Sequence, residues 1–425
     1  MQELFDLFYQ SNGICTDTRA LVKDCLFICL KGDRFDANAF AEKAVEGGAK
    51  YVVASDPARC NGTTIHHVDN TLLYLQQLAL YHRRKFNIPV LGITGSNGKT
   101  TTKELVNAVL STSKKVLCTK GNLNNHIGVP LTLLQLSPEH EIAIIEMGAN
   151  RPGDIAELCE IAQPTHGIIT NIGKAHLEGF GSFEGVLNTK LGLYNFVEHQ
   201  QGTLFYNSDD SVLTRYLPNL SCSTYAIHNS ATVVGTAHDL TPFLAFKYTT
   251  QQGIFGPIYT QLVGEYNLYN FLSAVTIGLY FGVSSADVER ALSSYVPSNN
   301  RSQVQKTERN TLIVDCYNAN PSSMGAALIS FHQTKCNNKL ALLGDMLELG
   351  EVSKEEHAAV LRYCETSHIP CITVGKEFGE CRSNFRHFAT TAQLIDSEVL
   401  ASINDTTILI KGSRGIGLEQ IIPFL

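Results

Sequence analysis

Residues 95–101 read Gly-Ser-Asn-Gly-Lys-Thr-Thr and directly follow the apolar run 89–94. After the loop, the apolar residues of 105–110 recur at the spacing of one helix face. A strand, a glycine-rich loop and a helix in this order are the context that a phosphate-binding loop requires. The glycines let backbone N–H groups turn toward phosphate oxygens, and Lys99 supplies a mobile cation for the terminal phosphates. This stretch therefore predicts a nucleotide-binding P-loop domain.

The loop departs from the strict Walker A pattern, because Ile93 stands where that pattern has its first glycine. A chance Gly-Lys-Thr in a glycine-rich loop is the alternative, but the strand before it and the helix after it favour nucleotide binding. Thr100 is placed to put its hydroxyl on Mg2+. The residues expected to contact ATP here are Gly95, Ser96, Asn97, Gly98, Lys99, Thr100 and Thr101.

Composition limits the class of protein. The chain has 425 residues, of which 44% are hydrophobic and 17% charged, and its formal net charge is −7. This is typical of a soluble globular protein of about two to four domains. An acidic balance argues against a nucleic-acid partner, and neither a signal peptide nor a membrane-spanning stretch is evident. Twelve scattered cysteines without a C-x-x-C pair indicate reduced thiols in a cytoplasmic protein.

Strand and helix patterns divide the chain into three segments, expected at 1–85, 86–298 and 299–425. The first is a small α/β unit, and the second carries the phosphate loop on a mostly parallel sheet. A turn-rich stretch precedes the third, in which helices separate four apolar runs: 311–314, 339–343, 371–374 and 407–410. Such a pattern predicts a doubly wound, Rossmann-like domain, so the fold class is α/β with three domains.

Two further residues follow apolar runs of the second segment. Glu146 ends the run 142–145, where an acid can hold Mg2+ as a Walker B carboxylate does. The alternative is a solvated acid at the start of a loop. His176 follows the run 167–172 and is a possible metal ligand, although a lone histidine is more often a surface or core residue.

Several longer strings resemble the Mur ligase family. They run in order through nearly the whole chain and are far more specific than the phosphate loop alone. The strings are 95–101, Gly-Asn-Leu-Asn-Asn at 121–125, Glu-Met-Gly-Ala at 146–149, Ala-His-Leu-Glu-Gly-Phe-Gly-Ser at 175–182, Tyr-Asn-Ala-Asn-Pro-Ser-Ser-Met at 317–324, Leu-Gly-Asp-Met-Leu-Glu-Leu-Gly at 343–350 and Lys-Gly-Ser-Arg-Gly at 411–415.

The resemblance implies an ATP-dependent ligase with UDP-N-acetylmuramoyl-tripeptide and D-alanyl-D-alanine as substrates. The three segments would then be a UDP-substrate domain, a central ATPase and a C-terminal ligase domain. ATP would phosphorylate the peptide carboxylate, and the dipeptide amine would attack the acyl phosphate. Another Mur-type or folylpolyglutamate synthetase-like ligase, or a nucleotide-gated binding protein without turnover, is the alternative. We expect a monomer.

The resemblance also implies roles for individual residues. The expected magnesium ligands are Thr100, Glu146, His176 and Lys190, with Lys190 as a carbamate formed with CO2. The expected catalytic residues are Lys99, Glu146, His176 and Lys190. The nucleotide pocket would add Asn267, Asn270, Arg301 and Asp315. Substrate contacts are expected from Thr18, Arg19, Lys31, Gly32, Asn124, Asn125, Asn318 and Asn320.

Four positions depart from the family pattern. Leu191-Gly192 replaces Gly-Glu after Lys190, Tyr266 replaces His, Asn300 replaces Gly, and Ala37-Asn38 replaces Gly-His. These departures concern the adenine pocket and the uridine contacts. For the charged loops of the first segment, solvated turns are the alternative.

Overall fold

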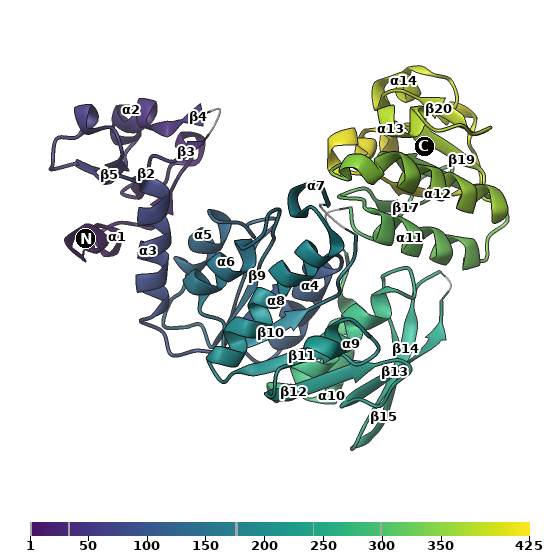
Figure 1. Cartoon of the computed structure of the whole chain (residues 1–425), viewed down its shortest axis with the longest axis horizontal. Helices are drawn as coiled ribbons and strands as arrows, with labels where there is room; N and C mark the ends of the chain where they lie inside the picture. The colour runs from purple at the N-terminus through teal and green to yellow at the C-terminus, as the bar shows by residue number, and fades with distance from the viewer. Residues whose placement is uncertain (1, 33–34, 175–176, 241, 298–299) are drawn as a thin grey trace. The chain divides into compact units, whose positions relative to one another are not determined.

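The computed structural model describes the whole chain except residues 1, 33–34, 175–176, 241 and 298–299 (Figure 1). Two compact units are found. One comprises residues 1–92, 114–148 and 155–166, and the other comprises residues 93–113, 149–154 and 167–425. Within the described part of the chain, no helix combines the length and the apolar character needed to cross a membrane.

The N-terminal sheet has four parallel strands in the order β1-β2-β5-β6. Cysteine, phenylalanine and alanine side chains fill its core, among them Cys29 and Phe27. A short hairpin, β3–β4, stands apart from this sheet. The elements are α1 (Gln2–Tyr9), β1 (Ile14–Cys15), β2 (Leu26–Ile28), β3 (Lys31–Gly32), β4 (Phe35–Asp36), α2 (Ala41–Glu46), β5 (Tyr51–Ala54), β6 (Ile65–His67) and α3 (Thr71–Arg83).

The central sheet has nine strands in the order β15-β14-β13-β12-β11-β10-β7-β9-β8. Its first elements are β7 (Val90–Thr94), α4 (Lys99–Leu110), β8 (Val116–Cys118), α5 (Gly128–Leu133), β9 (Ile142–Glu146), α6 (Asp154–Ala162), β10 (His166–Ile169), α7 (Leu177–Phe180) and α8 (Phe183–His199). Next come β11 (Thr203–Asn207), β12 (Ser221–Ala226), β13 (Val233–Asp239), β14 (Ala245–Thr250), β15 (Gly253–Tyr259), α9 (Asn267–Tyr280) and α10 (Ser285–Ser294). Strands β13, β14 and β15 pair antiparallel.

The C-terminal sheet has six strands in the order β16-β17-β21-β18-β19-β20. All its pairings are parallel except that of β16 with β17. Its elements are β16 (Gln303–Lys306), β17 (Thr311–Asp315), α11 (Pro321–Gln333), β18 (Lys339–Gly344), α12 (Ser353–Thr366), β19 (Cys371–Val374), α13 (Lys376–Gly379), β20 (Arg386–Phe388), α14 (Thr391–Asp396) and β21 (Thr407–Lys411).

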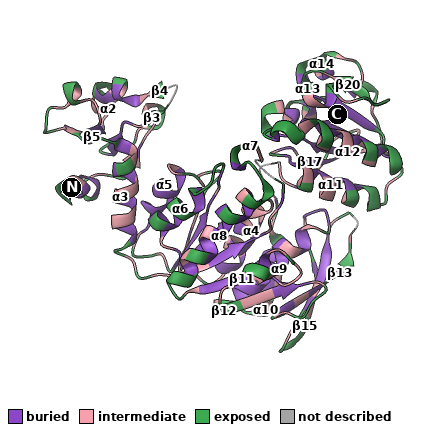
Figure 2. Cartoon of the chain, in the orientation of Figure 1, coloured by how far each residue is buried: buried purple, intermediate pink, exposed green. Residues whose placement is uncertain are grey.

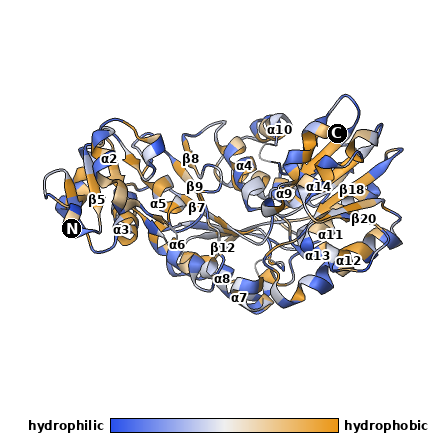
Figure 3. Ribbon diagram, turned by 90° about the horizontal axis from the view of Figure 1, so that it is seen from above, coloured by the Kyte–Doolittle hydropathy of each residue, from blue (hydrophilic) through white to orange (hydrophobic). Residues whose placement is uncertain are grey.

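Both faces of this C-terminal sheet are covered. Ile313 of β17 packs with α11 and α12 on one face, whereas its neighbours Leu312 and Val314 pack with α14 and the C-terminal residues on the other. This alternation follows from the two-residue period of a strand. Figure 2 shows the inner strands of this sheet as mostly buried, and Figure 3 shows apolar strands beside helices that are polar on one side. The predicted doubly wound arrangement is confirmed.

The four predicted C-terminal strands lie where expected, within one residue at their ends. Two edge strands, β16 and β20, were not predicted, since they read Gln-Val-Gln-Lys and Arg-His-Phe and lack an apolar run. Edge strands are exposed along one side and need no such run. The expected domain boundaries at 85 and 298 stay a prediction.

Candidate functional site

The phosphate loop joins β7 to α4, as the sequence predicts. Two of its glycines have positive φ angles, 148° at Gly95 and 79° at Gly98. A Cβ at Gly95 would collide with the Thr170 hydroxyl, and one at Gly98 would lie 2.6 Å from Oδ1 of Asn270. Both positions therefore require glycine, for conformation and for space.

The loop is braced by the segment that follows β10. The Asn97 N–H donates to Oδ1 of Asn171 at 3.0 Å, and the Ser96 hydroxyl donates to the Gly173 carbonyl at 3.0 Å. Lys99 folds over its own loop, and its Nζ donates to the carbonyls of Gly95 and Ser96 at 2.6 and 3.1 Å. The ammonium thus lies at the loop where phosphates would bind.

We expect Gly98→Ala to lower the melting temperature and to weaken ATP binding at least about tenfold, because a left-handed alanine costs roughly 1–2 kcal/mol and its Cβ displaces Asn270. Gly325→Ala is the control, since a Cβ there, inside α11, meets nothing within 4 Å. That variant should be stabilised by about 0.5–1 kcal/mol. Calorimetric ATP titration measures the first effect, and an alanine variant that binds ATP like the parent protein would contradict it.

Glu146 ends β9 and is 1% exposed. Its Oε1 accepts a hydrogen bond of 2.8 Å from the Asn124 amide, and its backbone N–H donates to the Thr119 hydroxyl at 3.0 Å. A buried carboxylate at a strand end is a hard oxygen donor suited to Mg2+. The solvated-acid alternative is wrong, because this side chain is buried.

Lys190 lies on α8 and is 2% exposed. Burial lowers the pKa of its ammonium well below the ordinary value, and the positive charge of Lys99 lowers it further. Its Nζ lies 6.0 Å from the centroid of the Phe180 ring. A lowered pKa favours the neutral amine, which is the nucleophilic form of a lysine.

The two asparagines expected in the nucleotide pocket are buried at the start of α9. The Asn270 amide donates to Oδ1 of Asn267 at 2.8 Å and accepts from the Thr102 hydroxyl at 3.2 Å. The Asn267 amide donates to the Val263 carbonyl at 2.7 Å. The bond from Thr102 ties α9 to α4, and it holds the Asn270 side chain against Gly98.

In the C-terminal part, Asp315 ends β17 and is held by two donors. Its Oδ2 accepts from Nζ of Lys411 at 2.6 Å, and its Oδ1 accepts from the Ser302 N–H at 3.3 Å. Asn318 is exposed, whereas Asn320 is buried and begins α11 with a capping box. The Asn320 amide also donates to Oδ1 of Asn97 at 2.8 Å, so it is already engaged at the phosphate loop.

Among the expected substrate residues of the first segment, Thr18 is partly buried and the other three are exposed, and the two charged residues are paired with neighbouring aspartates. Arg19 forms a bidentate pair with Asp17, which lowers the pKa of Asp17 to about 2, and Lys31 lies 3.3 Å from Asp36. Thr18 lies in the same turn as Arg19, and Gly32 follows Lys31 in the hairpin. Their substrate contacts stay a prediction.

Asn125 has a local structural role, since its Oδ1 accepts the N–H groups of Ile127 and Gly128 at the start of α5. His176 lies outside the described residues. Its role as a metal ligand stays a prediction. Thr100 is 6% exposed near the start of α4, and its role as a metal ligand stays a prediction as well.

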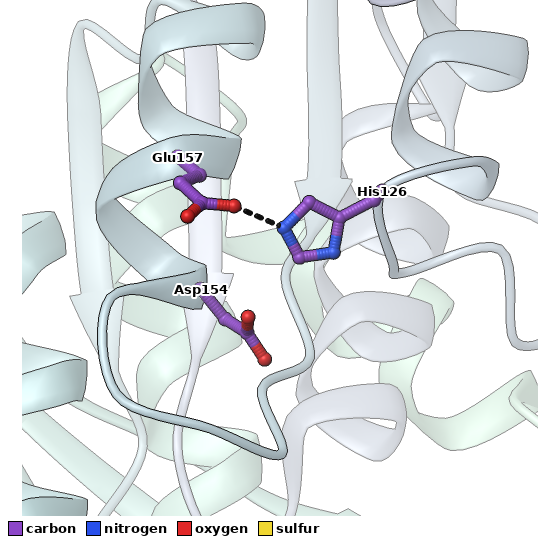
Figure 4. Close-up of side chains that lie close together, drawn as sticks. All are labelled: His126, Asp154 and Glu157. Carbon is purple, nitrogen blue, oxygen red and sulfur yellow. Dashed lines mark hydrogen bonds and ion pairs between the residues drawn. The ribbon is translucent and has the colours of Figure 1, made fainter. Parts of the chain in front are cut away.

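Nε2 of His126 and Oε2 of Glu157 are hydrogen-bonded at 2.8 Å, with Asp154 nearby (Figure 4). Asp154 is already committed at the start of α6, because its oxygens accept from Nε of Arg151 and from two backbone N–H groups. We therefore assign no metal to these three side chains.

Comparison with known proteins places the chain in a family. Residues 93–278 match the model of the Mur ligase middle domain, and residues 300–414 match that of the Mur ligase glutamate ligase domain. The UDP-N-acetylmuramoyl-tripeptide–D-alanyl-D-alanine ligase of Bacillus subtilis is 34% identical, over 97% of this chain and 93% of its own length. The chain belongs to the Mur ligase family.

Two solved Mur ligases share the whole architecture. MurF from Acinetobacter baumannii superposes with a TM-score of 0.88 at 30% identity, covering 99% of this chain and 97% of its own. The MurF ligase from Thermotoga maritima, solved in complex with ADP, has a TM-score of 0.87 at 25% identity with the same coverage. The predicted three-domain α/β architecture of a Mur ligase is therefore confirmed.

Sequence reasoning missed two functional candidates in this Mur ligase. Tyr317 and Arg414 stand in strings that carried the family resemblance, but neither was given a role. Their side chains lie together in the structure, with the Arg414 guanidinium 5.6 Å from the centroid of the Tyr317 ring. No local spacing links residues so far apart in the sequence.

Proposed function

We propose that this chain joins D-Ala-D-Ala to UDP-N-acetylmuramoyl-tripeptide with the use of ATP. The relatives that match nearly the full length carry this activity in their names. The observation that carries the proposal is Lys190, which is 2% exposed and whose pKa is lowered by burial and by the nearby charge of Lys99 in the phosphate loop. A binding protein without turnover needs no such amine, because a phosphate loop alone holds a nucleotide.

The chemistry follows from the substrates. A carboxylate is a poor electrophile, so its oxygen first attacks the γ-phosphorus of ATP and ADP leaves. The dipeptide amine then attacks the acyl carbon, the amide bond forms, and inorganic phosphate and a proton are released. Both steps depend on positioning and on stabilisation of developing negative charge, which the loop N–H groups and Lys99 can provide.

Mg2+ would neutralise the charge that develops on the phosphates. Its ligands in this proposal are Thr100, Glu146, His176 and the carbamate of Lys190. The donor set fits, since a buried carboxylate and a hydroxyl are the oxygen ligands that Mg2+ prefers. The carbamate would add an anion where the free ammonium would repel the metal.

The remaining assignments rest on the family resemblance. Asn267, Asn270, Arg301 and Asp315 would surround ATP, and the loops at 18–19 and 31–32 would bind the UDP moiety. We propose that the reaction takes place in the cytoplasm, as the family resemblance implies. The chain is proposed to act as a monomer without a nucleic-acid partner.

Phosphate release from ATP is expected to require both UDP-N-acetylmuramoyl-tripeptide and D-Ala-D-Ala. A coupled phosphate assay measures release with each substrate alone and with both, with the lysine and the diaminopimelate tripeptides in separate arms. Glutamate with a folate is the control pair for the rival ligase. Equal turnover with that pair, or release that ignores D-Ala-D-Ala, would overturn the proposed function.

A further inference from the structure

A buried serine joins the start of α9 to the end of β17. The Ser302 hydroxyl is hydrogen-bonded to the Tyr266 hydroxyl at 2.9 Å and accepts from the Asn267 amide at 3.4 Å. The Ser302 backbone N–H donates to Oδ1 of Asp315 at 3.3 Å. Ser302 is 6% exposed, so water competes little for these bonds. One residue therefore contacts both the first turn of α9 and the carboxylate that ends β17.

Hydrogen bonds continue from this serine in both directions. On one side, Asn267 accepts from Asn270, which in turn accepts from the Thr102 hydroxyl of α4. On the other side, Asp315 accepts from Nζ of the buried Lys411 at 2.6 Å. In the low-dielectric interior of a protein, removing one member of such a line leaves its neighbours unsatisfied. The serine is the member of this line that joins α9 to the C-terminal sheet.

The backbone at the serine has an unusual conformation. The φ angle of Ser302 is 47°, and that of Asn300 is 54°. Between these two residues, the Arg301 guanidinium lies 3.8 Å from the centroid of the Tyr317 ring. Left-handed backbone is unfavourable for residues other than glycine, and it persists where surrounding contacts fix it. The hydrogen bonds of Ser302 are contacts of this kind, so its position is tightly constrained.

The Tyr266 side chain is directed toward the serine by its surroundings. A Cβ at Gly264 would collide with the Tyr266 ring, so this ring packs directly on the glycine, whose φ is 92°. Burial raises the pKa of the Tyr266 phenol, and the negative charge of Asp315 raises it further. The phenol therefore stays protonated at neutral pH and keeps the proton that it shares with the Ser302 hydroxyl.

We propose that Ser302, held by the Tyr266 hydroxyl, is a positioning residue that sets Asp315 relative to α9 for ATP binding. This inference rests on the proposed function, in which Asn267, Asn270 and Asp315 are among the residues that surround ATP. Such a pocket is built from two parts of the chain, and one nucleotide contacts both parts only when their spacing is right. Groups that are already fixed bind more tightly, because they lose less freedom when the ligand arrives. The bridge through Ser302 fixes this spacing.

Calorimetric titration with ATP and Mg2+ compares the parent protein with variants that lack one hydroxyl. Ser302→Ala and Tyr266→Phe are each expected to raise the Kd for ATP about tenfold, because each removes one buried hydrogen bond. The double variant should bind ATP about as weakly as either single variant, since both changes remove the same bond.

Ser302→Gly separates positioning from loss of stability. It also lacks the hydroxyl, but glycine adopts a positive φ angle without strain. This variant should fold at least as well as Ser302→Ala and bind ATP equally weakly. In hydrogen-exchange mass spectrometry, ATP should slow exchange across residues 302–315 of the parent protein. Both Ser302 variants should lose this ATP-dependent slowing.

Thr276→Val is the matched control. Thr276 is 2% exposed on the same helix, and its hydroxyl donates to the Leu272 carbonyl within α9. Loss of this hydroxyl should lower the melting temperature and leave the Kd for ATP within about twofold of the parent value.

Three results would overturn the inference. Ser302→Ala and Ser302→Gly proteins that bind ATP like the parent would show that the bridge sets nothing. A double variant that binds about 100-fold more weakly would show that the two hydroxyls act separately. Equal weakening by Thr276→Val would show that any buried hydroxyl of α9 has the same effect. Parent protein that binds no ATP overturns the proposed function itself, and the inference with it.

Discussion

Lys190→Ala is expected to lower turnover by about 100-fold or more, and a small carboxylate such as acetate should partly restore it. Holding an ordinary lysine neutral at pH 7 costs about 4–5 kcal/mol. At Lys190, burial and the nearby Lys99 lower the pKa and so reduce that cost. The neutral amine can then react with CO2, and the carbamate supplies an anion that added acetate can mimic.

Lys103→Ala is the matched control for this experiment. Lys103 is another fully buried lysine, on α4, but it lies 2.9 Å from the Glu104 carboxylate and so has an anionic partner. Its replacement should lower stability, and acetate should restore no activity. A Lys190→Ala enzyme with full activity in CO2-depleted buffer would show that Lys190 has no catalytic role.

Glu146→Ala is expected to raise the barrier to turnover by about 3 kcal/mol or more while it changes ATP affinity much less. The reason is that a metal ligand acts mainly on charge that develops in the transition state. Steady-state kcat and calorimetric ATP binding, each across a range of Mg2+ concentrations, measure the two effects separately. The variant should also need more Mg2+ for half-maximal turnover.

Glu141→Ala provides the matched control on the same strand segment. Glu141 is exposed just before β9 and accepts the Lys115 N–H at 2.8 Å. Its replacement should leave kcat and the Mg2+ requirement unchanged. If Glu146→Ala also keeps the kcat of the parent enzyme, this carboxylate is no magnesium ligand.

Buried strands of the fold could be predicted because parallel strands covered on both faces read as unbroken apolar runs. The runs at 311–314 and 371–374 became β17 and β19 for this reason. The antiparallel ribbon β13–β15 was not predicted, since its strands carry mixed burial patterns without a long apolar run. Edge strands β16 and β20 were missed on the same physical ground.

The sequence by itself determined the phosphate loop, because its glycines, its lysine and the flanking strand and helix are local features. It also indicated Glu146, since an acid after a buried run lies at the ligand edge of a parallel sheet. Only the tertiary structure decided that Lys190 is buried near Lys99, and that Arg301 and Arg414 meet at Tyr317. A lowered pKa and the contacts of a side chain both depend on which distant residues surround a group, and packing alone brings those residues together.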